Sequence, residues 1–209
     1  MMGEVGRLQP QFPTLARQRE ADHFGMLIFL TTEVLIFGGL FAALFVLRAE
    51  HGAEYVKSSK AMHLWLGGLN TAVLLTSSAV VALMVEAVKA GGARLAKWLL
   101  SGAIALGLMF LAIKFTEYGL EYRDGLVPHL SPRNLHSGPD TLFMDLYFAA
   151  TGLHALHVTA GLALLASLIW PFGAAPRDSS AVLAGNAALY WHLVDVIWVF
   201  LYPTLYLAR

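Results

Sequence analysis

The sequence predicts an all-α integral membrane protein built as a bundle of five transmembrane helices. Composition is the first indication, because 57% of the 209 residues are hydrophobic and only 13% are charged. A soluble domain carries about 25% charged residues. The second indication is a set of five separate apolar stretches, each long enough to cross about 30 Å of hydrocarbon with about 20 residues. These stretches are continuous rather than alternating, and a helix satisfies its own backbone hydrogen bonds where water is absent.

The predicted helices follow one another along the chain as a single domain over residues 23–209, since no internal repeat or low-complexity tract divides it. A polar N-terminal arm, residues 1–22, precedes them. No small-residue cleavage site follows the arm, so we expect the first apolar segment to remain as an anchor. The proline-containing connection around residues 119–140 is expected to be an ordered surface loop or a partner contact. The helices are predicted at about residues 24–47, 63–86, 97–118, 141–170 and 182–207.

Composition also limits the partners and cofactors. Net charge is zero, so nothing suggests a nucleic-acid partner. The chain has no cysteine, which excludes disulfides, zinc–thiolate sites, a dinuclear copper–thiolate centre, iron–sulfur clusters and covalently attached haem. Any metal bound by the chain would have to use its eight histidines and its carboxylates.

The connections between the predicted helices fall alternately on the two sides of the membrane. The side with the N-terminal arm carries seven Lys and Arg residues and the other side carries six. Acidic residues contribute little to the rule that positive charge stays inside. The compact basic turn at residues 87–97 favours a cytoplasmic N-terminus and an external C-terminus.

Glu33 is the only ionisable residue inside the first predicted helix. It lies about nine residues into the segment, or roughly 14 Å deep at about 1.5 Å per residue, which is close to the middle of the bilayer. A bare carboxylate is expensive there, so we expect a partner on another helix. One interpretation is a proton relay or a gate on one. The other is a structural hydrogen bond that ties two helices together.

The second and third predicted helices carry further polar residues. Asn70 shares a face with Gly67 and Ser77 at helical spacing, and small residues let membrane helices approach closely. Lys114 and Glu117 lie three residues apart, which favours an intrahelical ion pair near the membrane interface. A contact with a lipid headgroup or another subunit is the alternative. Asn70, Lys114 and Glu117 are therefore possible lipid or subunit contacts.

The fourth and fifth predicted helices each carry a polar pair. His154 and His157 lie near the centre of the fourth helix, and His192 and Asp195 lie near the middle of the fifth. The usual helical metal pair is spaced by four residues, so we expect neutral histidines that hydrogen-bond across helices rather than metal ligands. Their similar depth predicts that Glu33 or Asp195 faces a histidine of the fourth helix. These five residues form a predicted intramembrane polar cluster, proton-related or structural in role.

Four stretches of these helices, in this order, resemble subunit III of the haem–copper oxidases, and most closely the cytochrome c oxidase branch. The pair Glu117-Tyr118 also resembles the end of a family helix. The resemblance covers roughly residues 23–207, and the chain is similar to a short, five-helix bacterial form without the first two helices of seven-helix members. The four stretches are residues 26–41 with Glu33, 69–75, 150–158 with both histidines, and 190–198 with His192 and Asp195.

The resemblance implies a subunit without redox centres that binds no cofactor of its own except phospholipid. It would pack directly against subunit I, where haem and copper reduce oxygen to water in a reaction coupled to proton pumping. Subunit II and small subunits of the same complex would be further partners. Glu33 matches the family's carbodiimide-reactive membrane carboxylate, which implies a role in sustaining proton uptake. The resemblance implies residence in the bacterial cytoplasmic (inner) membrane, with the C-terminus on the periplasmic side.

Other functions stay open at this point. The equivalent subunit of a quinol oxidase, or an accessory membrane subunit of a nitric oxide reductase, would share much of the pattern. An independent haem protein would use His154 and His192 as ligands from facing helices. A small transporter would use Glu33 and Asp195, but no repeat or broken-helix pattern supports it. No serine lies in a nucleophile-elbow setting, which argues against a hydrolase.

Overall fold

The computed structural model describes residues 10–128, 138–169 and 177–208. Every regular element in these ranges is a helix, and five of the helices are long and apolar enough to cross a membrane. The predicted class, an all-α membrane bundle with five spans, is confirmed. In chain order the helices are α1 (Leu15–Glu50), α2 (Gly52–Ala61), α3 (Leu64–Lys89), α4 (Ala93–Arg123), α5 (Pro139–Ser167) and α6 (Arg177–Tyr206).

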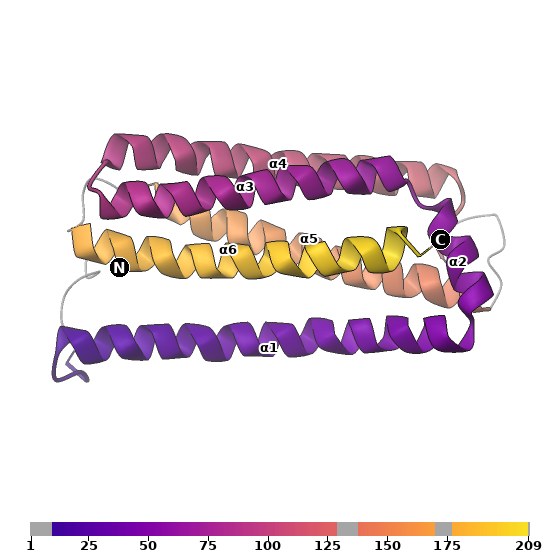
Figure 1. Ribbon diagram of the computed structural model, residues 1–209, viewed down its shortest axis with the longest axis horizontal. Helices are drawn as coiled ribbons and strands as arrows, with labels where there is room; N and C mark the ends of the chain where they lie inside the picture. The colour runs from indigo at the N-terminus through magenta and orange to yellow at the C-terminus, as the bar shows by residue number, and fades with distance from the viewer. Residues whose placement is uncertain (1–9, 129–137, 170–176, 209) are drawn as a thin grey trace.

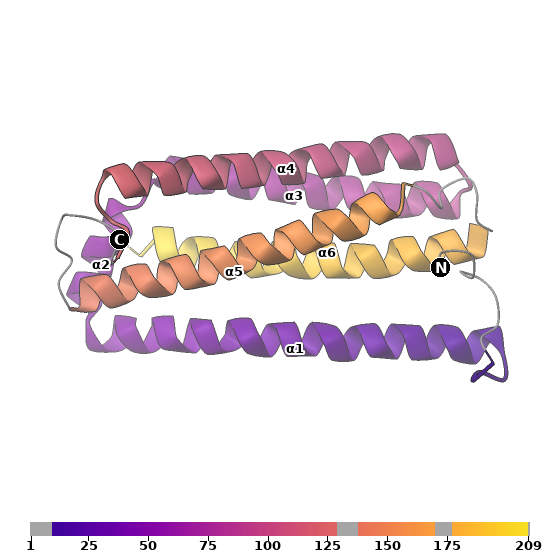
Figure 2. The same ribbon diagram turned by 180° about the vertical axis from the view of Figure 1, so that it is seen from behind.

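The long helices run side by side, with α5 and α6 between the pair α3 and α4 on one side and α1 on the other (Figures 1 and 2). Helix α1 lies at the edge of the bundle, and it is correspondingly less buried than the other long helices. Only 17% of its most apolar stretch is buried, against 50% for α6. Most of α1 therefore presents apolar side chains to whatever surrounds the bundle, and its inner face carries the contacts that hold it.

The helix ends differ from the predicted ones because polar residues continue the helices beyond the hydrocarbon. Helix α1 begins at Leu15, where the Thr14 hydroxyl accepts a 3.3 Å hydrogen bond from the Arg17 amide. The polar arm predicted over residues 1–22 is therefore partly helical, while residues 1–9 lie outside the described part. Helix α4 continues to Arg123, so the connection predicted from about residue 119 starts later. Residues 129–137 of that connection also lie outside the described part.

Glycines in the left-handed region end both α3 and α4. Gly91 has φ 82° and Gly125 has φ 74°. After α3 the Gly92 amide donates to the Ala87 carbonyl at 2.9 Å, and after α4 the Leu126 amide donates to the Glu121 carbonyl at 2.9 Å. Both turns have the six-to-one hydrogen bond of the Schellman motif, which satisfies carbonyls that a helix end leaves without partners.

Helix α2 was not predicted, and it lies across one end of the bundle (Figure 1). Its Tyr55 hydroxyl donates to the Thr204 carbonyl at 2.8 Å, and its Ser59 hydroxyl donates to the Leu205 carbonyl at 2.8 Å. The last carbonyls of α6 have no intrahelical partner, so these side chains cap that helix. Burial raises the pKa of Tyr55 to about 12, although Arg48 opposes the shift, so the hydroxyl keeps the proton that it donates.

The same helix also holds the start of α5. Lys57 Nζ lies 3.0 Å from Asp140 Oδ2, and the Ser58 hydroxyl donates to Asp140 Oδ1 at 3.1 Å. Asp140 is in the first turn of α5, where a negative charge also favours the helix dipole. Helix α2 therefore clamps the beginning of α5 and the end of α6 together.

Glycines allow the long helices to approach closely around one tryptophan. Trp191 of α6 is fully buried between Gly107 of α4 and Gly161 of α5. A Cβ atom on Gly107 would lie 2.8 Å from Trp191 Cη2, and one on Gly161 would lie 2.8 Å from Trp191 Cε3. The indole fills the space that the absent side chains leave, as small residues at membrane helix contacts permit.

Candidate functional site

Glu33 of α1 and His157 of α5 form a buried acid–histidine pair. Glu33 Oε2 lies 2.6 Å from His157 Nε2, and each residue is only 8% exposed. The other ring nitrogen, His157 Nδ1, lies 2.8 Å from the Leu153 carbonyl oxygen. A carbonyl can only accept, so Nδ1 carries a hydrogen. The hydrogen in the 2.6 Å contact therefore belongs either to the carboxyl group or to an imidazolium, and the pair shares one proton while staying neutral overall.

Aromatic side chains surround the pair and join α1 to α5 and α6. The Phe37 ring meets the His157 ring edge-on at 5.3 Å, and Phe29 stacks on Tyr190 at 5.9 Å. The Tyr190 hydroxyl donates to the His157 carbonyl at 3.2 Å. The predicted contact between Glu33 and a histidine of the fourth span is thus present, and His157 is the histidine that makes it.

His154 differs from the prediction that it hydrogen-bonds across helices. It is fully buried, and neither ring nitrogen has a hydrogen-bond partner among the described residues. Its ring lies 5.0 Å from the Trp198 ring and meets Phe110 edge-on at 5.5 Å. His154 therefore packs as an aromatic residue between α4 and α6, while His157, one turn away, points to α1.

His192 and Asp195 of α6 do not face α5, contrary to the alternative in which Asp195 meets a fourth-span histidine. His192 Nδ1 lies 2.7 Å from the Ser78 hydroxyl on α3 and 3.9 Å from Asp195 Oδ2. Both partners approach the same ring nitrogen. A catalytic Ser–His–Asp arrangement places them on opposite nitrogens, so this group is a polar tie between α3 and α6.

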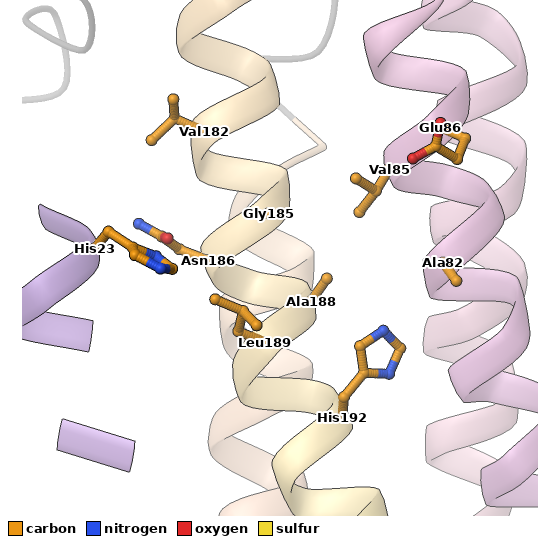
Figure 3. Close-up of a pocket in the computed structure, with 10 residues that line it drawn as sticks. All are labelled: His23, Ala82, Val85, Glu86, Val182, Gly185, Asn186, Ala188, Leu189 and His192. Carbon is orange, nitrogen blue, oxygen red and sulfur yellow. The ribbon is translucent and has the colours of Figure 1, made fainter. Parts of the chain in front are cut away.

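A pocket of about 520 Å³ lies beside His192, between α3, α6 and the start of α1. Figure 3 shows Asn186 and His23 on one side of α6, and His192 on its other side facing α3. The lining is mostly apolar, with these three residues and Glu86 as its polar groups. It has the composition of a site for an amphipathic molecule.

Lys114 and Glu117 lie inside the bundle, at 1% and 0% exposure. Lys114 Nζ is 3.0 Å from Glu117 Oε2 and donates to the hydroxyls of Tyr147 and Tyr206, each at 2.8 Å. The predicted ion pair is present, and it is buried between the helices. Sequence reasoning missed the two tyrosines because they come from α5 and α6, and hydroxyls on distant helices leave no periodic signal. Glu121 joins this set through a hydrogen bond from the Tyr147 hydroxyl. We call these five residues the Lys114 network: Lys114, Glu117, Glu121, Tyr147 and Tyr206.

Burial also argues against the lipid or subunit contact predicted for Asn70, Lys114 and Glu117. Asn70 is fully buried, and within the described part of the chain neither atom of its amide has a hydrogen-bond partner. It lies on the inner face of α3 with Gly67 and Ser77, as predicted, and Ser77 donates to the Ala103 carbonyl at 3.2 Å. None of the three side chains reaches the surface, so none contacts a headgroup or a partner directly.

The described residues bring no group of three or more His, Asp or Glu side chains into a metal-binding arrangement. His154 and His157 turn toward different helices, and His192 turns toward Ser78. Glu33 with His157, and Ser78 with His192, instead form pairs between helices, and Lys114, Glu117 and Glu121 belong to one network.

The fold and these buried pairs define a polytopic, all-helical membrane protein. Comparison with known proteins narrows this class, because residues 14–208 match the family model described as cytochrome c oxidase subunit III. The chain belongs to the cytochrome c oxidase subunit III family, as its motifs predicted.

Individual relatives agree with the family match. The chain is 31% identical to cytochrome c oxidase subunit 3 of Thermostichus vulcanus, over 97% of each chain. It is 34% identical to the protein of the same name from Synechocystis sp., over 88% of this chain and 74% of the relative. The Gallus gallus protein is 31% identical over 88% of this chain and 68% of its own. The match therefore extends over most of the bundle.

Proposed function

We propose that the chain is the non-redox subunit III of a haem–copper terminal oxidase in aerobic respiratory electron transport. It carries no catalytic centre of its own; haem and copper are held by partner subunits. It packs against subunit I and stabilises it, within a complex that also contains subunit II and small subunits. Support comes from the family match over residues 14–208 and from polar side chains that are engaged with one another between helices.

The Glu33–His157 pair is the observation that carries a role in proton uptake. Its two partners share one proton across 2.6 Å, so that proton can move between carboxyl and imidazole without creating net charge in the bundle. The pair is buried at 8% exposure, and its acid lies on a helix at the edge of the bundle (Figure 1). We infer that it supplies or gates protons for subunit I.

Phospholipid and membrane placement complete the proposal. The outer face of α1 is apolar, with Leu27, Ile28, Val34 and Leu35 all exposed, which suits contact with lipid chains. The complex resides in a bacterial cytoplasmic membrane, with the N-terminus of this chain on the cytoplasmic side and the C-terminus on the periplasmic side. The basic turn between α3 and α4 supports this orientation.

Glu33→Gln in the purified complex tests the proton role. The amide keeps the size of the side chain and removes the shared proton. We expect assembly and the haem spectra of the partner subunits to be unchanged, while proton uptake slows or the number of turnovers before inactivation falls. The matched control is Glu86→Gln, an exposed carboxylate paired with Lys89 at 2.8 Å. Failure of the Glu33 variant to assemble would make the pair structural only.

The complex with which the chain copurifies tests the assignment itself. A copper-containing haem oxidase that oxidises cytochrome c is the expected partner. Copurification with an enzyme that oxidises quinol would make the chain a quinol oxidase subunit instead. Copurification with an iron–haem nitric oxide reductase would make it an accessory subunit of that enzyme. The same preparation analysed by intact mass spectrometry identifies the bound lipids.

A further inference from the structure

The Lys114 network is a set of hydrogen bonds in which one polar atom, Glu121 Oε2, has no hydrogen-bond partner among the described residues. Lys114 Nζ gives its three hydrogens to Glu117 Oε2, at 3.0 Å, and to the hydroxyls of Tyr147 and Tyr206. Tyr206 in turn donates to Glu117 Oε1 at 2.8 Å, and Tyr147 donates to Glu121 Oε1 at 2.5 Å. An ammonium has three hydrogens and a phenol has one. Every hydrogen of the ammonium and of the two phenols is thus used, and both Glu117 oxygens are occupied.

Glu121 Oε2 is the remaining atom. Glu121 is fully buried, and Oε2 has no hydrogen-bond partner within the described part of the chain. The Lys114 ammonium is also enclosed by rings: its Nζ lies 4.9 Å from the Tyr118 ring centre, 4.7 Å from that of Tyr147 and 5.5 Å from that of Trp198. Lys114, Glu117 and Glu121 are therefore all shielded from solvent by the bundle.

Charge balance shows what is missing at Glu121 Oε2. One ammonium faces two carboxyl groups, so the network carries an excess negative charge if both are ionised. An uncompensated charge in an apolar interior costs far more than a neutral hydroxyl without a partner. A metal cation would need several oxygen ligands, and the other acceptor oxygens of the network already receive hydrogen bonds. One proton restores neutrality and requires no further ligand.

We propose that Glu121 Oε2 is a proton-binding site that keeps the Lys114 network neutral and is separate from the Glu33–His157 pair. The network joins α4, α5 and α6 and includes no residue of α1, so it does not share the proton of Glu33. Besides the network residues, Asp124 just beyond α4 also acts on the Glu121 carboxyl electrostatically. The titratable side chains of α3 are Glu86 and Lys89, at its opposite end.

Glu121 lies close to one end of the bundle. Glu121 lies in the last turn of α4, and its carbonyl accepts the Leu126 amide of the Schellman turn. Leu126 packs against the core above it. The site therefore lies just beneath the end of the bundle that carries α2 (Figure 1).

Infrared difference spectroscopy tests the site in the full chain, within the purified complex. A protonated carboxyl group has a C=O stretch, shifted in deuterium oxide, at a higher frequency than the bands of carboxylates and glutamine side chains. We expect this band at neutral pH in wild type and its loss in Glu121→Gln. It should persist in Glu33→Gln, which separates the site from the proposed proton uptake. Absence of a Glu121-dependent band in wild type, or its loss in Glu33→Gln, would overturn the inference.

Two further variants test the charge balance. Glu117→Gln removes one negative charge, so Lys114 then neutralises Glu121, and the band should disappear although Glu121 is still present. Lys114→Met removes the cation, so both carboxyl groups must be neutral and the carboxylic-acid signal should roughly double. If Lys114→Met does not fold, the glutamine variants still decide. A band unchanged in Glu117→Gln would contradict the balance.

Discussion

Glu33 on α1 and His157 on α5 lie 2.6 Å apart and join the peripheral helix to the middle of the bundle. Residues that share one hydrogen bond are energetically coupled. We expect Glu33→Gln and His157→Gln together to cost less than the sum of the single changes, with a coupling of roughly 0.5–3 kcal/mol in the free energy of unfolding. Thermal or denaturant unfolding in detergent measures it. A control cycle with Glu33→Gln and Glu86→Gln should be additive, and additivity in the first cycle would exclude an energetic contact.

The close packing around Trp191 predicts opposite effects for two kinds of glycine. Gly107→Ala forces a Cβ atom to within 2.7 Å of Leu162 Cδ2, and such overpacking costs about 1–3 kcal/mol. Gly38→Ala on α1 meets no atom within 4 Å, so it should be neutral or stabilising by up to about 1 kcal/mol. The midpoint of thermal unfolding distinguishes them. Equal midpoints would show that α4 does not pack this closely against the side chains of Leu162 on α5 and Trp191 on α6.

The clamp made by α2 predicts a local effect at the end of α6. Tyr55→Phe removes the hydroxyl that donates to the Thr204 carbonyl, and leaving a buried acceptor without a partner costs about 1–3 kcal/mol. Amide hydrogen exchange should accelerate in the last turn of α6, with little change in α3. The control is Lys57→Ala, whose side chain is 76% exposed and whose ion pair should contribute at most about 1 kcal/mol. Unchanged exchange in Tyr55→Phe would place the stability of that turn elsewhere.

Asn70 and Thr71 are neighbours, and replacing them should change the free energy of unfolding in opposite directions. Neither atom of the Asn70 amide has a hydrogen-bond partner among the described residues, so Asn70→Leu should leave stability unchanged or raise it by about 1–3 kcal/mol. Thr71 accepts from Trp198 Nε1 at 3.0 Å. Thr71→Val keeps the shape and leaves that indole N–H unpaired, so it should destabilise by a similar amount. A loss of stability in Asn70→Leu would reveal a bound water that the amide holds.

The five membrane-spanning helices could be predicted from the sequence because the length of an apolar run specifies such a helix. The sequence was less informative about their ends. Helix α1 starts at Leu15 and α4 continues to Arg123 because polar residues form helix as readily outside hydrocarbon as apolar ones do inside. Helix α2 escaped prediction since its ten residues show no apolar stripe; Tyr55 and Ser59 anchor it through hydroxyls.

The depth of a side chain in the bilayer can be predicted from its position along a helix, and this decides which parts of the site were predictable. Counting residues fixes the height of a side chain in the bilayer, so Glu33 and His157 could be matched. It does not fix rotation about the helix axis, which is set by packing. That rotation turns His154 to Trp198, His192 to Ser78, and Lys114 to tyrosines of two other helices. Lys114 illustrates this difference. Its partner Glu117, three residues away on the same helix, could be predicted from spacing, whereas its burial depends on helix rotation and could not.

The bond between Tyr55 and Thr204 spans 149 positions of the chain, and this has a consequence for biogenesis. A ribosome makes Tyr55 long before it makes Thr204, so α2 has no partner at the end of α6 until synthesis is nearly complete. Closure over so long a separation is slow compared with local helix formation. The clamp is therefore among the last contacts to form. A chain that stops before Thr204 leaves the Tyr55 and Ser59 hydroxyls of α2 without their acceptors at the end of α6.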